Sequence, residues 1–444
     1  MNTPIYDFVN NYVQNGGVRM HMPGHKGAGN IEKFDITEFT GADSLYSADG
    51  IIKESEKNAS LLFSADTFYS AEGSSLSIRA MLYLINLYAK QSGKRATILA
   101  SRNAHKVFVS ASALLDIDVI WINASEGESY LSRKVTHSDV EREILALPEP
   151  PVAVYLTSPD YLGNMLDIEG ISEVCRKFGT LLAVDNAHGA YLKFLESSLH
   201  PTDLGADLCC DSAHKTLPCL TGAGYLHIRC GAPEILRENA KDAMALFGST
   251  SPSYLILSSL DKANEYLASD FKSELSATIE KIGILRQNLT RGGYSFLGNE
   301  PMKLTIRAKE YGYLGYELCR ELEARGIMPE FADRDFLTLM PSTKTTDADF
   351  EAIKNALSSI KKREKIQEIA PDIKIPERKL SPREAVLSQS EVVAVKDAMG
   401  RILADVTVGC PPAVPIIVSG EAVDEDAISA FLYYGIEKIK VVKQ

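Results

Sequence analysis

TLLAVDNAHGAYLKFLESSLHPTDLGADLCCDSAHKTLP, residues 180–218, contains two short apolar runs that each end in an aspartate. Runs of this length and character predict β-strands that are covered on both faces. The carboxyl ends of neighbouring strands in an α/β sheet open into the crevice where such folds bind ligands. Asp185 closes the first run, and Lys215 follows the second run after Asp211. The stretch therefore predicts an α/β fold in which Asp185 and Lys215 lie at the same edge of the sheet.

The same alternation of apolar strand-like runs and helical patterns extends from about residue 55 to residue 230. It is typical of βαβ units and predicts a mostly parallel, doubly wound large domain. The expected strands are 96–100, 117–122, 152–157, 180–185, 206–211 and 223–229. The expected helices are 75–91, 105–115, 137–146 and 168–178, and Gly179 follows the last of them at the position that favours glycine.

The pattern divides the chain into three parts. Residues 1–50 form an N-terminal arm, and 51–291 form the large domain, which ends in two consecutive linking helices within 253–291. Residues 292–444 form a smaller C-terminal α+β domain whose tail piece is 381–444. In this domain we expect strands near 302–307 and 335–340 and helices near 312–325 and 347–362.

Composition narrows the class of protein. The 444 residues carry 47 Lys and Arg against 59 Asp and Glu, a net charge of −12, which argues against a nucleic-acid or anionic-membrane partner. No run approaches the roughly 18 apolar residues that span a bilayer, and the N-terminus lacks a secretory signal pattern, so we expect a cytoplasmic protein. The seven cysteines are scattered without a C-x-x-C pair, which predicts reduced thiols rather than a disulfide framework.

Asp185 and Lys215 each have an ordinary structural explanation, as a helix cap and as a solvated lysine. Together they suggest pyridoxal phosphate chemistry. A lysine whose neighbours lower its pKa forms a Schiff base as the free amine. A buried aspartate can face the pyridine nitrogen and keep it protonated.

Several ordered motifs then resemble one family. They are HMPGHKG (21–27), DITE (35–38), SRNAHK (101–106), TSPDYLG (157–163), VDNAHGAY (184–191), DSAHKTLP (211–218), GSTSPSYLILSSLD (248–261) and the tail CPPAVPIIVSGE (410–421). The chain resembles the pyridoxal-phosphate-dependent ornithine/lysine/arginine decarboxylases, in the shorter form without an N-terminal wing domain. The resemblance implies the fold-type-I, aspartate-aminotransferase-like architecture.

The resemblance implies a role for each matching residue. Lys215 is expected to form the Schiff base, Asp185 to partner the pyridine nitrogen, His105 to stack on the cofactor ring and Ala187 to pack on its other face. The phosphate is expected at Gly73, Ser74 and Ser75, at a helix N-terminus that suits an anion. Further cofactor contacts are expected from His188, Ser212 and His214.

Glu421 is the candidate carboxylate for a cationic substrate side chain. The segment Ser249–Ser253 is expected near the phosphate of a neighbouring subunit, which implies a homodimer or higher homo-oligomer with shared active sites.

The activity implied is decarboxylation of a basic amino acid to CO₂ and a polyamine-type amine, with arginine, giving agmatine, ahead of lysine and ornithine. Two alternatives stay open: another fold-type-I enzyme such as an aminotransferase or aldolase, and a non-catalytic paralogue that binds the cofactor. The sequence departs from the family pattern at Asn186, where relatives usually have Glu, and in the tail at Cys410, Ala413 and Ser419. A metal site is not expected, because the five histidines in the quoted motifs show no helical i, i+4 ligand pattern.

Overall fold

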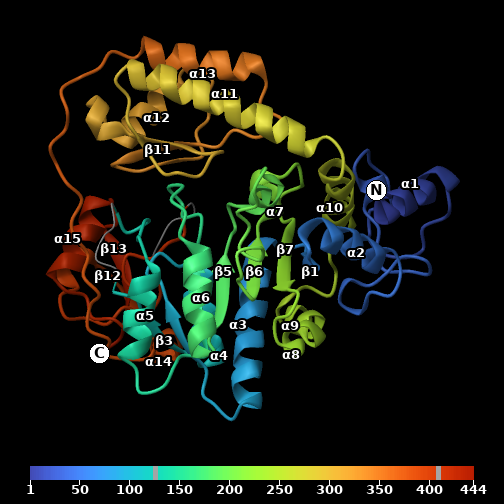
Figure 1. Ribbon diagram of the computed structural model, residues 1–444, viewed down its shortest axis with the longest axis horizontal. Coiled ribbons are helices and arrows are strands. Elements are labelled where there is room, and N and C mark those ends of the chain that lie inside the picture. Colours follow the sequence, from blue (N-terminus) through green and yellow to red (C-terminus); the bar gives the residue numbers. More distant parts are fainter. Residues whose placement is uncertain (124–128, 407–411) are drawn as a thin grey trace. The chain divides into compact units, whose positions relative to one another are not determined.

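The computed structural model describes residues 1–123, 129–406 and 412–444 (Figure 1). It contains two compact units whose chain segments interleave. The first unit comprises Met1–Ala96, Pro150–Ser158 and Ile168–Ser273, and the second comprises Thr97–Glu149, Pro159–Asp167 and Glu274–Gln444. These units show which segments pack together and not which segments fold independently. The division into arm, large domain and C-terminal domain therefore stays a prediction.

The first unit is built on five strands in the order β1, β7, β6, β5, β4. The bounds are Ala65–Ser70, Gly224–Arg229, Leu208–Asp211, Leu181–Asp185 and Ala153–Thr157, respectively. Strands β4, β5 and β6 are parallel, whereas β7 is antiparallel to both of its neighbours. Asp185 pairs in register with Cys210, so the ends of β5 and β6 are level. The strands expected in this unit are confirmed, and β1 is a further strand that the sequence pattern does not predict.

Helices cover this sheet and complete the unit. Helix α3, Gly73–Gln91, packs against β1, β5, β6 and β7 (Figure 1). Helix α6, Ile168–Phe178, packs against β5, and the following Gly179 adopts a left-handed φ of +65°. The remaining helices of the unit are α1 (Pro4–Asn15), α2 (Ile51–Phe63), α7 (Ala213–Thr216), α8 (Glu234–Glu238), α9 (Ala240–Phe247) and α10 (Tyr254–Leu267).

The second unit contains three small assemblies. Parallel strands β2 (Thr97–Ala100) and β3 (Asp118–Trp121) accompany helices α4 (Lys106–Leu115), α5 (His137–Leu145) and α14 (Pro382–Leu387). An antiparallel sheet, in the order β10 (Phe331–Ala332), β11 (Phe336–Leu339), β9 (Leu304–Arg307), β8 (Phe296–Leu297), accompanies α12 (Gly315–Glu323). Strands β12 (Ser390–Ala394) and β13 (Lys438–Val442) pair beside α15 (Glu425–Tyr433).

The two consecutive helices expected within 253–291 are present as α10 and α11, Phe271–Arg291, and their role as a link between domains stays a prediction. Helix α11 runs beside α13, Asp347–Ser359, and Lys281 forms an ion pair with Asp347 (Figure 1). None of the described helices combines the length and the apolarity that crossing a membrane requires. The described cysteines are free thiols, three of them buried, and Cys410 lies outside the described residues.

Candidate active site

Asp185 ends β5 as a buried carboxyl group. Its Oδ1 accepts the backbone N–H of Ala187 at 3.1 Å, and its Oδ2 accepts the Tyr155 hydroxyl at 3.3 Å. Burial raises the pKa of Asp185, and the positive charge of Lys215 works in the opposite direction. A cationic partner favours the ionised carboxylate, and a protonated pyridine nitrogen would supply that charge.

Lys215 lies in α7, the short helix that follows β6. Its Nζ is 3.1 Å from Nε2 of His188, and its backbone N–H donates to the Ser212 carbonyl at 3.0 Å. His188 comes from the turn after β5, so the two neighbouring strand ends contribute both members of this pair. This contact places an imidazole nitrogen within hydrogen-bond distance of the amine, where the two groups can exchange a proton.

The start of α3 and the entry to β7 form a glycine cradle, which we define as Gly73, Gly222 and Gly224. Gly73 adopts a φ of +63°, and its N–H donates to the Gly222 carbonyl at 2.6 Å. A Cβ on Gly224 would lie 2.8 Å from the Gly73 carbonyl carbon and 3.0 Å from the Asp211 carbonyl oxygen. The backbone segments therefore approach as closely as glycine permits.

Side chains from the end of β6 and from the start of α3 meet at this cradle. Ser212 Oγ donates to Ser74 Oγ at 2.8 Å, and His214 Nδ1 lies 2.8 Å from the Ala223 carbonyl. Ser74 and Ser75 occupy the first turn of a 19-residue helix, whose N-terminus and dipole favour an anion. The first unit contains most of the expected cofactor residues. They are Gly73, Ser74, Ser75, Ser212 and His214, expected at the phosphate, together with Asp185, Ala187, His188 and Lys215.

Two expected site residues belong to the second unit. His105 is the N-cap of α4, and its Nδ1 accepts the Val107 N–H at 3.2 Å. A capping histidine keeps its ring at the helix start, and its role in stacking on the cofactor stays a prediction.

Glu421, the other of the two, is buried and already has a cationic partner. Its two oxygens accept Nη1 and Nη2 of Arg102 at 2.7 and 3.0 Å, and Oε2 also accepts the Val418 N–H at 2.7 Å. The Arg102 guanidinium carbon lies 4.8 Å from the Trp121 ring centroid. Glu421 therefore already contacts a cation of its own chain, and its role toward a substrate stays a prediction. Arg102 lies within the SRNAHK motif, yet the motif alone gives it no role.

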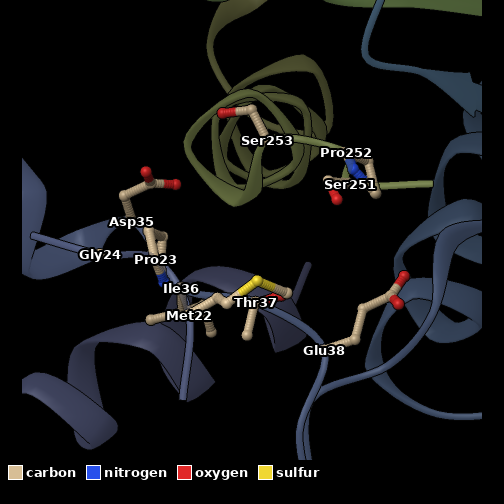
Figure 2. A pocket seen from close by; sticks show the side chains of 10 residues that line it. All are labelled: Met22, Pro23, Gly24, Asp35, Ile36, Thr37, Glu38, Ser251, Pro252 and Ser253. Atoms are coloured by element: carbon tan, nitrogen blue, oxygen red, sulfur yellow. The ribbon is translucent and has the colours of Figure 1, made fainter. Parts of the chain in front are cut away.

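The Ser249–Ser253 segment borders a pocket of about 350 Å³ (Figure 2). Two other quoted motifs supply the rest of its lining, through Met22–Gly24 and Asp35–Glu38. Figure 2 shows the side chains of Asp35 and Glu38 on opposite sides of the pocket. The Ser249 N–H donates to Glu72 Oε1 at 2.7 Å, which links this segment to the residue before the glycine cradle.

The departures from the family pattern have distinct surroundings. Asn186 is buried and donates through Nδ2 to Asp211 Oδ1 at 2.7 Å. Ala413 adopts a φ of +57°, and the buried Ser419 Oγ has no hydrogen-bond partner among the described residues. Cys410 lies outside the described ranges.

Comparison with known proteins agrees with this architecture. The model of the Orn/Lys/Arg decarboxylase major domain matches residues 3–300, and that of the C-terminal domain matches residues 364–439. Arginine decarboxylase of Bacillus subtilis is 29% identical, covering 96% of this chain and 92% of its own. Arginine decarboxylase of Halalkalibacterium halodurans is 28% identical with the same coverage. The lysine decarboxylase structure from Francisella novicida superposes with a TM-score of 0.81 at 17% identity, over 99% of this chain and 81% of that one.

The fold is that of the fold-type-I decarboxylases, as the sequence predicts. The chain belongs to the Orn/Lys/Arg decarboxylase family and is an amino-acid decarboxylase, a carbon–carbon lyase.

The site also fits the pyridoxal phosphate that this family implies. Asp185 is a buried carboxyl group whose pKa is raised by burial, and a cationic ring nitrogen would stabilise its ionised form. The glycine cradle lies at the N-terminus of α3, where the helix dipole favours an anion. Lys215 follows the strand beside that of Asp185, where an amine can reach the same ligand.

Proposed function

We propose that this chain binds pyridoxal 5'-phosphate at the ends of β5 and β6 and decarboxylates arginine to agmatine. The observation that supports the cofactor most directly is the placement of Asp185 and Lys215 on neighbouring strand ends beside the glycine cradle. The preference for arginine rests on the curated relatives named arginine decarboxylase, which match nearly the whole chain.

Each residue has a definite task in this proposal. Ser74, Ser75, Ser212 and His214 hold the phosphate, and Asp185 keeps a proton on the pyridine nitrogen. When bound, the cofactor supplies an electron sink for the pair left at Cα as CO₂ departs. Lys215 Nζ anchors the cofactor and then delivers a proton to Cα, and His188 Nε2, 3.1 Å away, can take up or return that proton. His105 and Ala187 are proposed to flank the ring.

Glu421 is a weaker candidate for the substrate's cationic group than the sequence suggests. Its carboxylate would have to leave Arg102 before it could bind a guanidinium or ammonium group. Asp35 and Glu38 at the pocket in Figure 2 are alternative carboxylates. Asp35 is paired only with the half-buried His25, at 3.2 Å, among the described residues, and a substrate cation could compete with that contact.

We further propose a homodimer in which the Ser249–Ser253 segment completes the partner's phosphate site. Mixing Lys215→Ala with Ser251→Asp protein under subunit exchange tests this directly. Shared sites predict activity in the mixture that neither variant has alone, and a mixture as inactive as its components argues for independent sites.

Product analysis separates the candidate reactions. The full chain with added pyridoxal phosphate is given arginine, lysine or ornithine, and CO₂, amine and keto acid are measured. We expect equal amounts of CO₂ and agmatine from arginine, loss of both in Lys215→Ala, and native turnover in the exposed control Lys354→Ala. Keto acid without CO₂ would indicate an aminotransferase, and bound cofactor without turnover would indicate the non-catalytic paralogue.

A further inference from the structure

A buried polar cluster lies directly beside the two strand ends that carry Asp185 and Lys215. We define the Asp211 cluster as Asp211, His200, His227 and Asn186, all of which have no exposed side-chain surface in the unit. Asp211 Oδ2 lies 3.1 Å from His200 Nε2 and 3.0 Å from His227 Nε2, and Oδ1 accepts Asn186 Nδ2 at 2.7 Å. One carboxylate therefore joins β7, the turn after β5 and the loop before β6.

The proton positions in this cluster follow from its chemistry. Burial opposes ionisation of Asp211, but interactions with the two histidines hold its pKa well below the usual value, and burial lowers the pKa of His227. An ionised carboxylate only accepts hydrogen bonds, so each Nε2 carries a hydrogen. The opposite ring nitrogens face threonine hydroxyls, His227 Nδ1 at Thr67 (2.9 Å) and His200 Nδ1 at Thr202 (2.8 Å).

The same carboxylate fixes the orientation of Asn186. Because Oδ1 of Asp211 can only accept, the amide must present its NH₂ group, and Asn186 Oδ1 is left buried without a hydrogen-bond partner among the described residues. That oxygen lies 2.0 Å from where a Cβ on Gly189 would be, so the amide occupies space that only glycine leaves open. The Asn186 N–H also donates to the Cys210 carbonyl at 3.0 Å.

Position in the chain connects the cluster to the reaction. Asn186 lies between Asp185 and Ala187, and Asp211 directly precedes the Ser212–Lys215 turn. A displaced Asn186 would move the Asp185 carboxylate, and a displaced Asp211 would move Ser212 and Lys215. The cluster touches none of the proposed reacting atoms, so its effect is on their placement.

Metal binding is the competing explanation for this cluster. Ligand atoms of His200, Cys209 and Asp211 lie within 4.8 Å of one another. Burial holds the pKa of the Cys209 thiol well above its usual value, which disfavours the thiolate that a metal needs, and both imidazole Nε2 atoms already point at one carboxylate oxygen.

We propose that Asp211, held by His200 and His227, is a positioning residue that acts through Asn186 to set the relative placement of Asp185 and Lys215. The inference rests on the proposed cofactor function and names the residues that make the cofactor site rigid. Its distinctive consequence is that the Asn186–Asp211 pair works equally well with the carboxylate and amide exchanged.

The test compares Asp211→Asn with the exchange variant Asn186→Asp/Asp211→Asn. In Asp211→Asn, the new amide keeps its oxygen toward the imidazole N–H groups and turns its NH₂ toward Asn186, so the Asn186 amide either presents a second donor or flips and buries its own NH₂ without an acceptor. In the exchange variant, the amide introduced at position 211 donates to the carboxylate introduced at position 186 and accepts from the histidines, so every bond is restored. Two readouts are used: the dissociation constant of pyridoxal phosphate from each apo-protein, and the pH midpoint of the visible absorbance band of each holo-protein.

We expect Asp211→Asn to weaken pyridoxal phosphate binding by about tenfold and to shift the absorbance midpoint, and the exchange variant to return both toward native values. Asp261→Asn is the matched control, because Asp261 is also a fully buried carboxyl group of the same unit, bound to the Ile5 and Tyr6 N–H groups. The control is expected to alter thermal stability and leave both cofactor readouts unchanged.

Distinct results would overturn the inference. If Asp211→Asn keeps the native affinity for pyridoxal phosphate and the native absorbance midpoint, the cluster has only a structural role, however much stability the variant loses. Failure of the exchange variant to recover either readout would reject the pairing, and this variant carries the test if Asp211→Asn does not fold. If native protein contains a stoichiometric metal ion and Asp211→Asn does not, the cluster is a metal site and the positioning role is rejected. A native protein without any visible band would instead remove the proposed cofactor function itself.

Discussion

At the scale of single residues, the buried ion pair of Arg102 and Glu421 bears on the stability of the second unit. Both side chains are almost completely buried, and two parallel N–H···O bonds join them. A paired, hydrogen-bonded charge is tolerated in the interior, whereas removing one partner leaves the other uncompensated. Glu421 therefore stabilises the second unit through Arg102.

Substitution separates this structural role from the substrate role that the sequence suggests. Glu421→Gln is expected to lower the free energy of unfolding by about 3–5 kcal/mol, because Arg102 loses its counter-charge in a buried site. Urea denaturation measures this loss, and the exposed pair variant Glu351→Gln is the control, with a change near zero. Unchanged stability together with a strongly raised KM for arginine would instead favour substrate binding by Glu421.

At the residue scale, the sequence predicts candidate reactive residues better than it predicts which residues contact one another. Asp185 and Lys215 can be found because apolar strands end at fixed, recognisable positions. The partners of Asp211 cannot, because the pairing of β6 with β5 and β7 brings Asn186 and His227 to it, and His200 reaches it from the loop before β6. Nothing in the spacing of Arg102 and Glu421, 319 residues apart, indicates that they meet.

At the scale of elements, the glycine cradle joins β7, β6 and the start of α3. Gly224→Ala is expected to destabilise the first unit by about 1–3 kcal/mol, because its Cβ would meet backbone atoms of Gly73 and Asp211 that cannot move independently. The same variant should also weaken pyridoxal phosphate binding. Thermal denaturation and cofactor titration check the two effects.

Gly283→Ala in α11 provides the contrasting control for this prediction. A Cβ at Gly283 would have no described neighbour within 4 Å, and alanine favours a helix over glycine. We expect a gain of up to about 1 kcal/mol. A Gly224→Ala protein as stable as the native chain would contradict the close approach described at the cradle.

The elements themselves differ in how visible they are in the sequence. Strands β4, β5 and β6 are buried at nearly every position, so continuous apolar runs reveal them. Strand β1, ADTFYS, alternates buried and half-buried residues over most of its length and carries a charge, so its pattern resembles a loop. Its place is set by antiparallel pairing with β7, which is a long-range contact.

At the scale of the whole molecule, the chain passes repeatedly between its two units. Residues 97–149 and 159–167 belong to the second unit although they interrupt the first. Local periodicity cannot show this exchange, because it depends on which distant segments pack together. The family motifs can still be recognised, since each is local in the sequence.

The pH dependence of stability is a property of the whole chain that buried carboxyl groups control. Burial raises the pKa of Asp261 to about 6, above its unfolded value of 3.8. The folded state therefore binds this proton more tightly, and its stabilising effect is complete below about pH 4 and lost as the pH rises to about 6. The loss is on the order of 1–3 kcal/mol.

Urea denaturation of native and Asp261→Asn protein between about pH 4 and 7 tests this effect. The difference in free energy of unfolding between the two should change over about pH 4–6 in favour of the variant and then level off. Burial also raises the pKa of Asp333, to about 7, but that contribution is common to both proteins and cancels. A difference that stays constant with pH would contradict the raised pKa of Asp261.

The most direct test of the cofactor site is to trap pyridoxal phosphate on the chain with borohydride and map the modified peptide by mass spectrometry. We expect one pyridoxyl group per chain, on Lys215, and none on Lys26 or Lys106, the other lysines in His-Lys pairs. Modification of a different lysine, or none in protein that releases CO₂ from arginine, would contradict the assignment of this site.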